Sequence, residues 1–110
     1  VYKRQVEIDL QGQINGETIS GVQMSGIGGS LDFVEGAAAS RGGMAILALP
    51  STTENGEHSK IVSRLGATTP VTIPRVCADI VVTEYGVAHL RGRTLRQRAE
   101  ALRALSARPR

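Results

Sequence analysis

Apolar and polar positions in the first part of the chain predict short strands separated by turns. Residues 6–10 alternate apolar and polar side chains, which is the pattern of a strand with one face buried. Gly12 and the pair Asn15-Gly16 follow as turn signals. Residues 19–24 form a second strand candidate, which leads directly into a cluster of glycines.

Two longer apolar runs predict strands inside the molecule. Residues 44–49 are continuously apolar, as in a strand covered on both faces, and Pro50 ends the run. Residues 80–83 form the second buried strand, which ends at a Glu-Tyr-Gly turn. Further short candidates are residues 60–65 and residues 71–73, the latter an edge or extended segment between two prolines.

Helical patterns occupy two other segments. Residues 32–40 are expected to form a helix that Gly42 and Gly43 end, and Thr94 is a good N-cap for a last helix. This last helix has an apolar stripe of Leu95, Ala99, Leu102 and Leu105, opposite a face of Arg96, Glu100 and Arg103. Strands that alternate with helices predict one α/β domain, with a mixed or parallel sheet and flanking helices.

Composition narrows the classes of function. The chain has 110 residues, enough for one small domain, and 41% of them are hydrophobic but only 3% aromatic. So few aromatic side chains leave little surface on which nucleic-acid bases could stack, and we expect no nucleic-acid partner. No signal peptide is recognised and no apolar run approaches the length of a membrane span, so a soluble, cytoplasmic protein with no membrane partner is expected.

The cysteine and the basic residues give few chemical leads. Cys77, the single cysteine, excludes an internal disulfide and lacks the companions of a zinc site, so no metal is expected. We expect it to be buried or half-buried rather than nucleophilic, because nothing in the sequence places His58 or His89 beside it. A solvated helix face is favoured over a phosphate or acidic partner for the C-terminal arginines, which are Arg91, Arg93, Arg96, Arg98, Arg103, Arg108 and Arg110.

The glycine cluster at residues 24–33 is the first candidate for chemistry. Gly26, Gly28 and Gly29 allow positive φ and close approach of a ligand, and the unpaired N–H groups of a following helix favour negative charge. Such a site fits a phosphate or a developing oxyanion, and the alternative is a plain strand-to-helix turn. Leu31 stands where a dinucleotide fingerprint needs another glycine, so that motif is excluded.

The second candidate is Glu84, which sits where an apolar strand ends and a Tyr-Gly turn begins. Ligands of open α/β sheets collect beyond the carboxyl ends of the strands. A carboxylate there can act as an acid or a base, or can orient a substrate. The alternative is a glutamate that caps the turn or pairs with a nearby arginine.

Six motifs in order resemble the C-terminal part of the acetyl-CoA hydrolase/CoA-transferase family. They read Gly-x-Gly-Gly-x-x-Asp-Phe from Gly26, Leu-Pro-Ser-Thr from Leu49, Ser-x-Ile-Val from Ser59, Val-Thr-x-x-Arg from Val71, Val-Val-Thr-Glu-Tyr-Gly-Val-Ala-x-Leu-Arg-Gly from Val81, and Arg98-Ala99. The resemblance spans nearly the whole chain. It implies that residues 1–110 are the C-terminal portion of a CoA-transferase-like (NagB/RpiA-like) domain, which acts on CoA or acyl-CoA together with a small carboxylate.

The resemblance also implies roles for individual residues. Gly29, with Gly28 beside it, matches the glycine whose N–H helps form the oxyanion hole and which lies against the CoA thioester. Ser25 and Gly26 match positions that bind CoA, and Glu84 matches an auxiliary active-site glutamate. The family's catalytic glutamate, which carries CoA as a thioester, lies upstream of the matched region. The chain alone is therefore expected to be inactive and to need the N-terminal half of the enzyme as a partner, or to form a homo-oligomer.

Two departures from the family pattern leave other functions open. Glu54 stands where a lysine commonly lies near the CoA phosphates. A carboxylate repels a phosphate, so CoA binding is weakened unless Lys60 or an arginine takes the place of that lysine. Residues Ser106 to Arg110 replace a usual His-Pro motif. The alternatives to an enzyme part are a non-catalytic module that binds CoA or a nucleotide, a subunit that works only with an N-terminal partner, and a remnant without a ligand.

Overall fold

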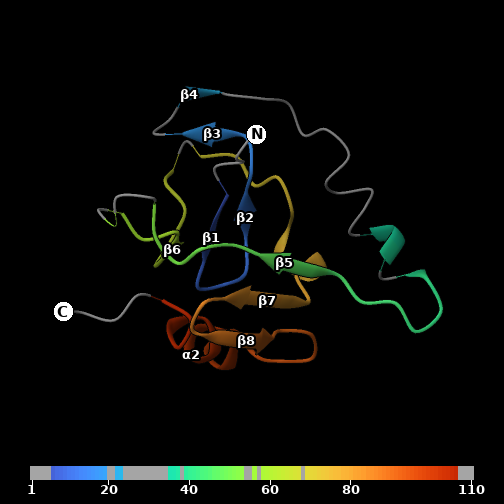
Figure 1. Cartoon of the computed structure of the whole chain (residues 1–110). Helices are drawn as coiled ribbons and strands as arrows, with labels where there is room; N and C mark the ends of the chain where they lie inside the picture. The colour runs from blue at the N-terminus through green and yellow to red at the C-terminus, as the bar shows by residue number, and fades with distance from the viewer. Residues whose placement is uncertain are drawn as a thin grey trace.

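The computed structural model describes residues 6–19, 22–23, 35–37, 39–53, 56, 58–67 and 69–106. Within these ranges the chain forms two three-stranded mixed sheets, one short hairpin and one well-formed helix (Figure 1). The predicted α/β class with a mixed sheet is confirmed at this level, although the strands are divided among several small sheets. No helix in the described part is both long and apolar enough to cross a membrane.

The first sheet has the order β2-β1-β6, with β1 at Glu7–Asp9, β2 at Ile14–Asn15 and β6 at Ile61–Val62. β1 pairs with β2 antiparallel and with β6 parallel. This confirms the strands expected in residues 6–10 and 60–65, in shorter form. Asn15 ends β2, and its Oδ1 accepts the backbone N–H of Glu17 at 3.0 Å, so the turn expected at Asn15-Gly16 is confirmed as well.

Asp9 explains why β1 and β2 form a hairpin. Its carboxylate is buried and accepts the backbone N–H groups of Gln11 at 2.9 Å and Gln13 at 3.0 Å. Gly12 completes the turn with a φ of +94°, a conformation that side-chain-bearing residues rarely adopt. The turn signal predicted at Gly12 is therefore confirmed.

The strand expected at residues 19–24 is instead a hairpin in its described part. β3 at Thr18–Ile19 pairs antiparallel with β4 at Val22–Gln23. The prediction treated two segments as one strand because their apolar positions are too few to show the reversal. Residues 20, 21 and 24 lie outside the described residues.

The second mixed sheet has the order β5-β7-β8, formed by β5 at Ile46–Ala48, β7 at Ile80–Thr83 and β8 at Gly86–His89. β5 and β7 run parallel, whereas β7 and β8 are antiparallel across a two-residue turn. The strand predicted at residues 80–83 is confirmed. β8 was not predicted, because its four residues are too few to show an apolar run.

The expectation that residues 44–49 are covered on both faces is wrong for the structure. Ile46 is 58% exposed and Met44 is also exposed. The physical reason is that β5 lies at the edge of its sheet, and alternate side chains of a strand point to opposite faces. Leu47 packs against the core while Ile46 points away from it.

The helical segments agree in part with the sequence. Residues 35–37 and 39 are helical, and the chain leaves the helix at Ser40, as expected for the end of the predicted helix at residues 32–40. The remainder of that prediction lies outside the described residues. A short 3-10 helix, η1, covers Arg75–Cys77, and α2 covers Leu95–Arg103. Thr94 caps α2 as predicted, and Gln97 completes a capping box with it.

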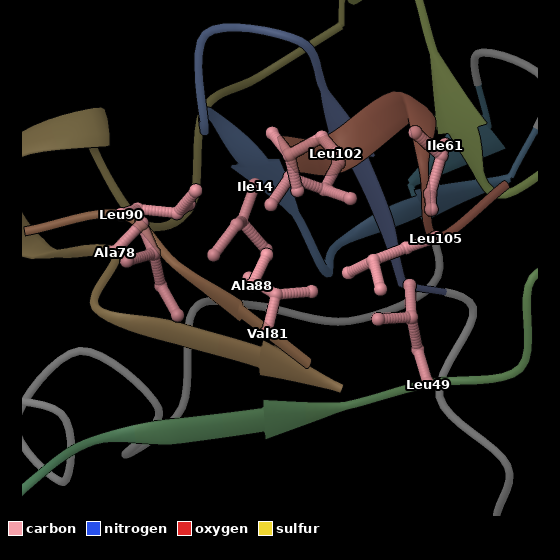
Figure 2. Packing of buried hydrophobic residues seen from close by; sticks show 11 residues of the cluster. Ile14, Leu49, Ile61, Ala78, Val81, Ala88, Leu90, Leu102 and Leu105 are labelled. Carbon is pink, nitrogen blue, oxygen red and sulfur yellow. The ribbon is translucent and has the colours of Figure 1, made fainter. Parts of the chain in front are cut away.

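One apolar cluster joins the two three-stranded sheets to α2 (Figure 2). Ile8, Ile14 and Ile61 contribute from the first sheet, whereas Val81 and Ala88 contribute from the second. α2 adds Leu102, and the turn directly after it adds Leu105, so these two together are the helix segment of the cluster. Both are buried, as the predicted stripe requires, but Leu95 is exposed and Ala99 is only half-buried. The outer face of Arg96, Glu100 and Arg103 is exposed as predicted.

Candidate functional site

The carboxyl ends of β5 and β7 bring two of the predicted motifs together. The strands are parallel neighbours, so the chain leaves both at the same edge of the sheet (Figure 1). The Leu-Pro-Ser-Thr motif begins just after β5, and Glu84 directly follows β7. The backbone N–H of Leu49 donates to the carbonyl oxygen of Val82 at 3.0 Å, which keeps the two exits side by side.

Ser51 and Glu84 are in direct contact at this edge. The backbone N–H of Ser51 donates to Oε1 of Glu84 at 2.8 Å, although the two residues are far apart in the sequence. Ser51 is only 1% exposed, whereas the side chain of Glu84 is exposed. Desolvation raises the pKa of Glu84, but hydrogen bonds from the backbone and side chain of Ser51 and from the Glu84 backbone together lower it more, so the net pKa is below its ordinary value.

The turn that carries Glu84 is fixed by its neighbours. The hydroxyl of the buried Thr83 donates to the carbonyl oxygen of Leu105 at 2.8 Å and accepts the N–H of Tyr85 at 3.2 Å. Gly86 follows with a φ of +146°, and a Cβ built there would lie 3.6 Å from Leu105. The end of the helix segment therefore holds the β7–β8 turn in place.

The segment after Ser51 returns to the first sheet. The carbonyl oxygen of Ser51 accepts the N–H of Lys60 at 2.8 Å, and Thr52 forms an isolated antiparallel bridge with Ser59. The N–H of Ile8 in β1 then donates to the carbonyl oxygen of Lys60 at 2.9 Å. The Leu-Pro-Ser-Thr and Ser-x-Ile-Val motifs are thus paired in space, next to the carboxylate of Glu84.

The remaining predicted site residues lie outside the described part of the chain. These are Ser25, Gly26, Gly28 and Gly29 of the glycine cluster, together with Glu54. Their predicted roles stay predictions. Within the described ranges, no group of three or more His, Cys, Asp or Glu side chains could hold a metal ion.

Cys77 and the arginines complete the set of predicted residues. Cys77 is half-buried, as expected, and precedes β7, whereas Glu84 follows that strand. Arg91, Arg93, Arg96 and Arg103 are exposed, in agreement with a solvated face, and Arg108 and Arg110 lie outside the described residues.

Arg98 departs from the solvated interpretation. It is 9% exposed, and its Nη1 donates to the carbonyl oxygens of Arg75 at 2.7 Å and of Gln11 at 3.3 Å. Burial lowers the pKa of Arg98, and the positive charge of Arg75 lowers it further. This buried arginine was missed because α2 presents it on the side of Leu102, a position that charge alone does not reveal.

The family of the chain follows from comparison with known proteins. Residues 2–110 match the model of the acetyl-CoA hydrolase/transferase C-terminal domain. The chain therefore belongs to this family, as the motifs had indicated.

Named relatives agree with this assignment. The chain is 53% identical over 97 residues to 4-hydroxybutyrate coenzyme A transferase of Clostridium kluyveri, in a match that covers 88% of the chain and 23% of that relative. It is 46% identical over 100 residues to butyryl-CoA:acetate CoA-transferase of Anaerostipes caccae, which it covers to 22%. The chain thus spans less than a quarter of the length of these relatives.

Solved structures show the same likeness. RipA from Yersinia pestis superposes with a TM-score of 0.83 at 44% identity, over 92% of this chain and 22% of that one. A 4-hydroxybutyrate CoA-transferase from Porphyromonas gingivalis superposes with a TM-score of 0.66 at 46% identity, over 92% of this chain and 21% of that one. The fold of the chain is therefore that of a part of these larger proteins.

Proposed function

We propose that the chain supplies part of the active site of an acyl-CoA:carboxylate CoA-transferase or an acetyl-CoA hydrolase. The observation that carries this proposal is the contact between Ser51 and Glu84, which joins two family motifs at the carboxyl edge of parallel strands. Such an edge is where ligands of α/β sheets bind. The family membership of the chain supports CoA thioesters as the substrate class.

The roles of individual residues form part of the same proposal. Gly29, with Gly28, offers a backbone N–H to the oxyanion that forms when the acyl-CoA carbonyl is attacked, while Ser25 and Gly26 contact CoA. Glu84 serves as an auxiliary carboxylate. The upstream polypeptide of the complete enzyme supplies the glutamate that takes CoA as a thioester, so the chain alone does not turn over substrate.

Further parts of the proposal concern the wider molecule. We assign the domain a NagB/RpiA-like arrangement, a cytoplasmic location and no metal requirement. Its partners are an acyl-CoA, a small carboxylate, and the N-terminal half of the enzyme or a second copy. The acceptor distinguishes the two activities, because a carboxylate acceptor gives transfer and water gives hydrolysis.

A chimera tests this function directly. The matched C-terminal part of the Clostridium kluyveri relative would be replaced by this chain, and CoA transfer to acetate would be measured. We expect an active chimera, and a loss of about 10²–10³-fold in kcat for Gly29→Pro, because proline removes one oxyanion donor. Glu84→Gln is expected to lower kcat, whereas the exposed Glu100→Gln serves as the matched control.

The chimera also separates the rival function. An inactive but folded chimera contradicts the proposal. Calorimetric titration of the chain with CoA, if it showed binding that Glu84→Gln leaves unchanged, would then favour a non-catalytic CoA-binding module. Transferase activity of the isolated chain would contradict the assignment of the nucleophile to the upstream polypeptide.

A further inference from the structure

Glu84 is an exposed side chain that nevertheless has a fixed partner, and this combination calls for an explanation. An exposed glutamate ordinarily samples many rotamers, because its three side-chain torsions are free. Here Oε1 accepts the backbone N–H of Ser51 at 2.8 Å, and the Ser51 side chain interacts with the same carboxylate. A hydrogen bond to a charged carboxylate is shorter and stronger than one between neutral groups.

We propose that Ser51 is a positioning residue of the active site, whose backbone N–H holds the Glu84 carboxylate at the carboxyl edge of the β5–β7 pair. The part of this proposal that concerns catalysis rests on the proposed function. The part that concerns geometry rests on the contact alone.

The donor is held rigidly on both sides. Pro50 fixes its own φ directly before Ser51, and Leu49 before it is bonded to Val82 of β7. After the donor, the carbonyl oxygen of Ser51 accepts the N–H of Lys60, and Lys60 is in turn bonded to Ile8. The Ser51 N–H is thus built into the junction between the two sheets.

The acceptor is anchored independently of the donor. Glu84 lies in the tight β7–β8 turn, where Thr83 is hydrogen-bonded to the carbonyl oxygen of Leu105. Two segments that are each fixed by other contacts therefore meet through the Ser51–Glu84 hydrogen bond. The bond selects one orientation of the carboxylate and does not need to hold the fold together.

This arrangement favours the ionised form of Glu84. Desolvation raises the pKa of Glu84, but the hydrogen bonds from Ser51 and from the Glu84 backbone together lower it more, so the pKa lies below its ordinary value. Glu84 is then an acceptor of hydrogen bonds or a partner for positive charge. It does not hold a proton with which it could act as a general acid at neutral pH.

Amide NMR of the 110-residue chain tests the geometry without altering Ser51. We expect the Ser51 amide proton to shift downfield as Glu84 ionises, with a midpoint below that of an ordinary glutamate. Glu84→Gln should abolish this shift, whereas Glu100→Gln should leave it unchanged. The amide of Leu49, which donates to a carbonyl oxygen, is the internal control. A Ser51 amide that does not titrate would overturn the proposal.

Two substitutions of Ser51 then test its effect on catalysis in the chimera. Ser51→Pro removes the N–H donor, whereas Ser51→Ala keeps it and removes only the hydroxyl. We expect Ser51→Pro to raise the pKa of Glu84 above that in Ser51→Ala, and to lower kcat by about 10–10²-fold, the effect of a small misplacement of an active-site group. The acidic limb of the pH–rate profile should therefore lie at higher pH in Ser51→Pro than in Ser51→Ala.

The outcomes separate this proposal from the function on which it rests. If the Ser51 amide titrates with Glu84 but Glu84→Gln leaves kcat unchanged, the active-site role of both residues is wrong while the hydrogen bond stands. If kcat depends on Glu84 while Ser51→Pro and Ser51→Ala show equal kcat and equal pH profiles, the positioning role of Ser51 alone is wrong.

Discussion

Arg98 shows how a single side chain can connect elements that are distant in the sequence. It extends from α2 and donates to backbone carbonyl oxygens of the β1–β2 turn and of η1. Hydrogen bonds from a charged donor contribute about 1.5–3 kcal/mol each, and a buried arginine needs such partners. The guanidinium therefore acts as a structural clamp rather than as part of a basic surface.

The close packing of Arg98 against Gly12 predicts that a side chain at position 12 destabilises the fold. A Cβ built on Gly12 would lie 2.9 Å from Nη1 of Arg98, and the φ of Gly12 is +94°. We expect Gly12→Ala to lower the free energy of unfolding by about 2–3 kcal/mol, since backbone strain and a displaced guanidinium act together. Urea denaturation measures this loss.

Gly42→Ala is the matched control for that substitution. Gly42 also has a positive φ, of +69°, but a Cβ there would meet nothing within 4 Å. Gly42→Ala should lower the free energy of unfolding only by the cost of backbone strain, about 1 kcal/mol. Equal losses in the two variants would contradict the clamp, because the guanidinium would then have moved aside at no cost.

Individual residues also show the limits of prediction from sequence. Glu84 could be singled out because a polar residue at the end of an apolar strand is a local pattern. Its partner Ser51 could not, because the contact depends on β5 and β7 being adjacent, which is a long-range fact. Arg98 has a local sign of burial, since it stands one helical turn before Leu102, but its hydrogen-bond partners come from other elements and could not be predicted.

At the scale of elements, α2 is the best predicted part of the chain. Its N-cap Thr94 and its charged face follow from neighbouring residues, and the structure confirms both. β8 was missed because it is short and lacks a run of apolar residues, so its existence depends on pairing with β7. The exposure of β5 was missed because a sequence does not reveal which strand lies at an edge.

The capping box of α2 makes a prediction for this element. The Thr94 hydroxyl accepts the N–H of Gln97 at 3.2 Å, and the Gln97 side chain accepts the N–H of Thr94 at 2.9 Å. Thr94→Ala should lower the free energy of unfolding by about 1 kcal/mol and speed amide exchange in the first turn of α2. Thr94→Ser keeps the hydroxyl and should remain close to the original chain. A loss of the same size in both variants would show that the methyl group matters rather than the cap.

At the scale of the whole molecule, stability depends on the apolar cluster that joins the sheets to α2. Both three-stranded sheets have only short strands, so each offers little apolar surface of its own. The cluster draws residues from both of them and from the helix segment (Figure 2). The site at the β5–β7 edge inherits its rigidity from this cluster, since Leu49 belongs to it and lies two residues before Ser51.

Leu102 and Leu95 form a matched pair that tests this cooperation. Both are leucines of α2, but Leu102 is 0% exposed in the cluster whereas Leu95 is 47% exposed. Leu102→Ala should lower the free energy of unfolding by about 2–5 kcal/mol, because it leaves a cavity where the sheets and the helix meet. Leu95→Ala should cost less than about 0.5 kcal/mol.

Amide hydrogen exchange shows whether Leu102→Ala destabilises the whole molecule or only α2. If the cluster unites the fold, Leu102→Ala accelerates exchange of the protected amides of β1, β7 and α2 by a similar factor, because they open in one cooperative step. The Ser51 amide should follow them, since its neighbours are bonded to both sheets. Faster exchange confined to α2 would instead mean that the sheets are stable without the helix, and that the Ser51–Glu84 contact does not depend on it.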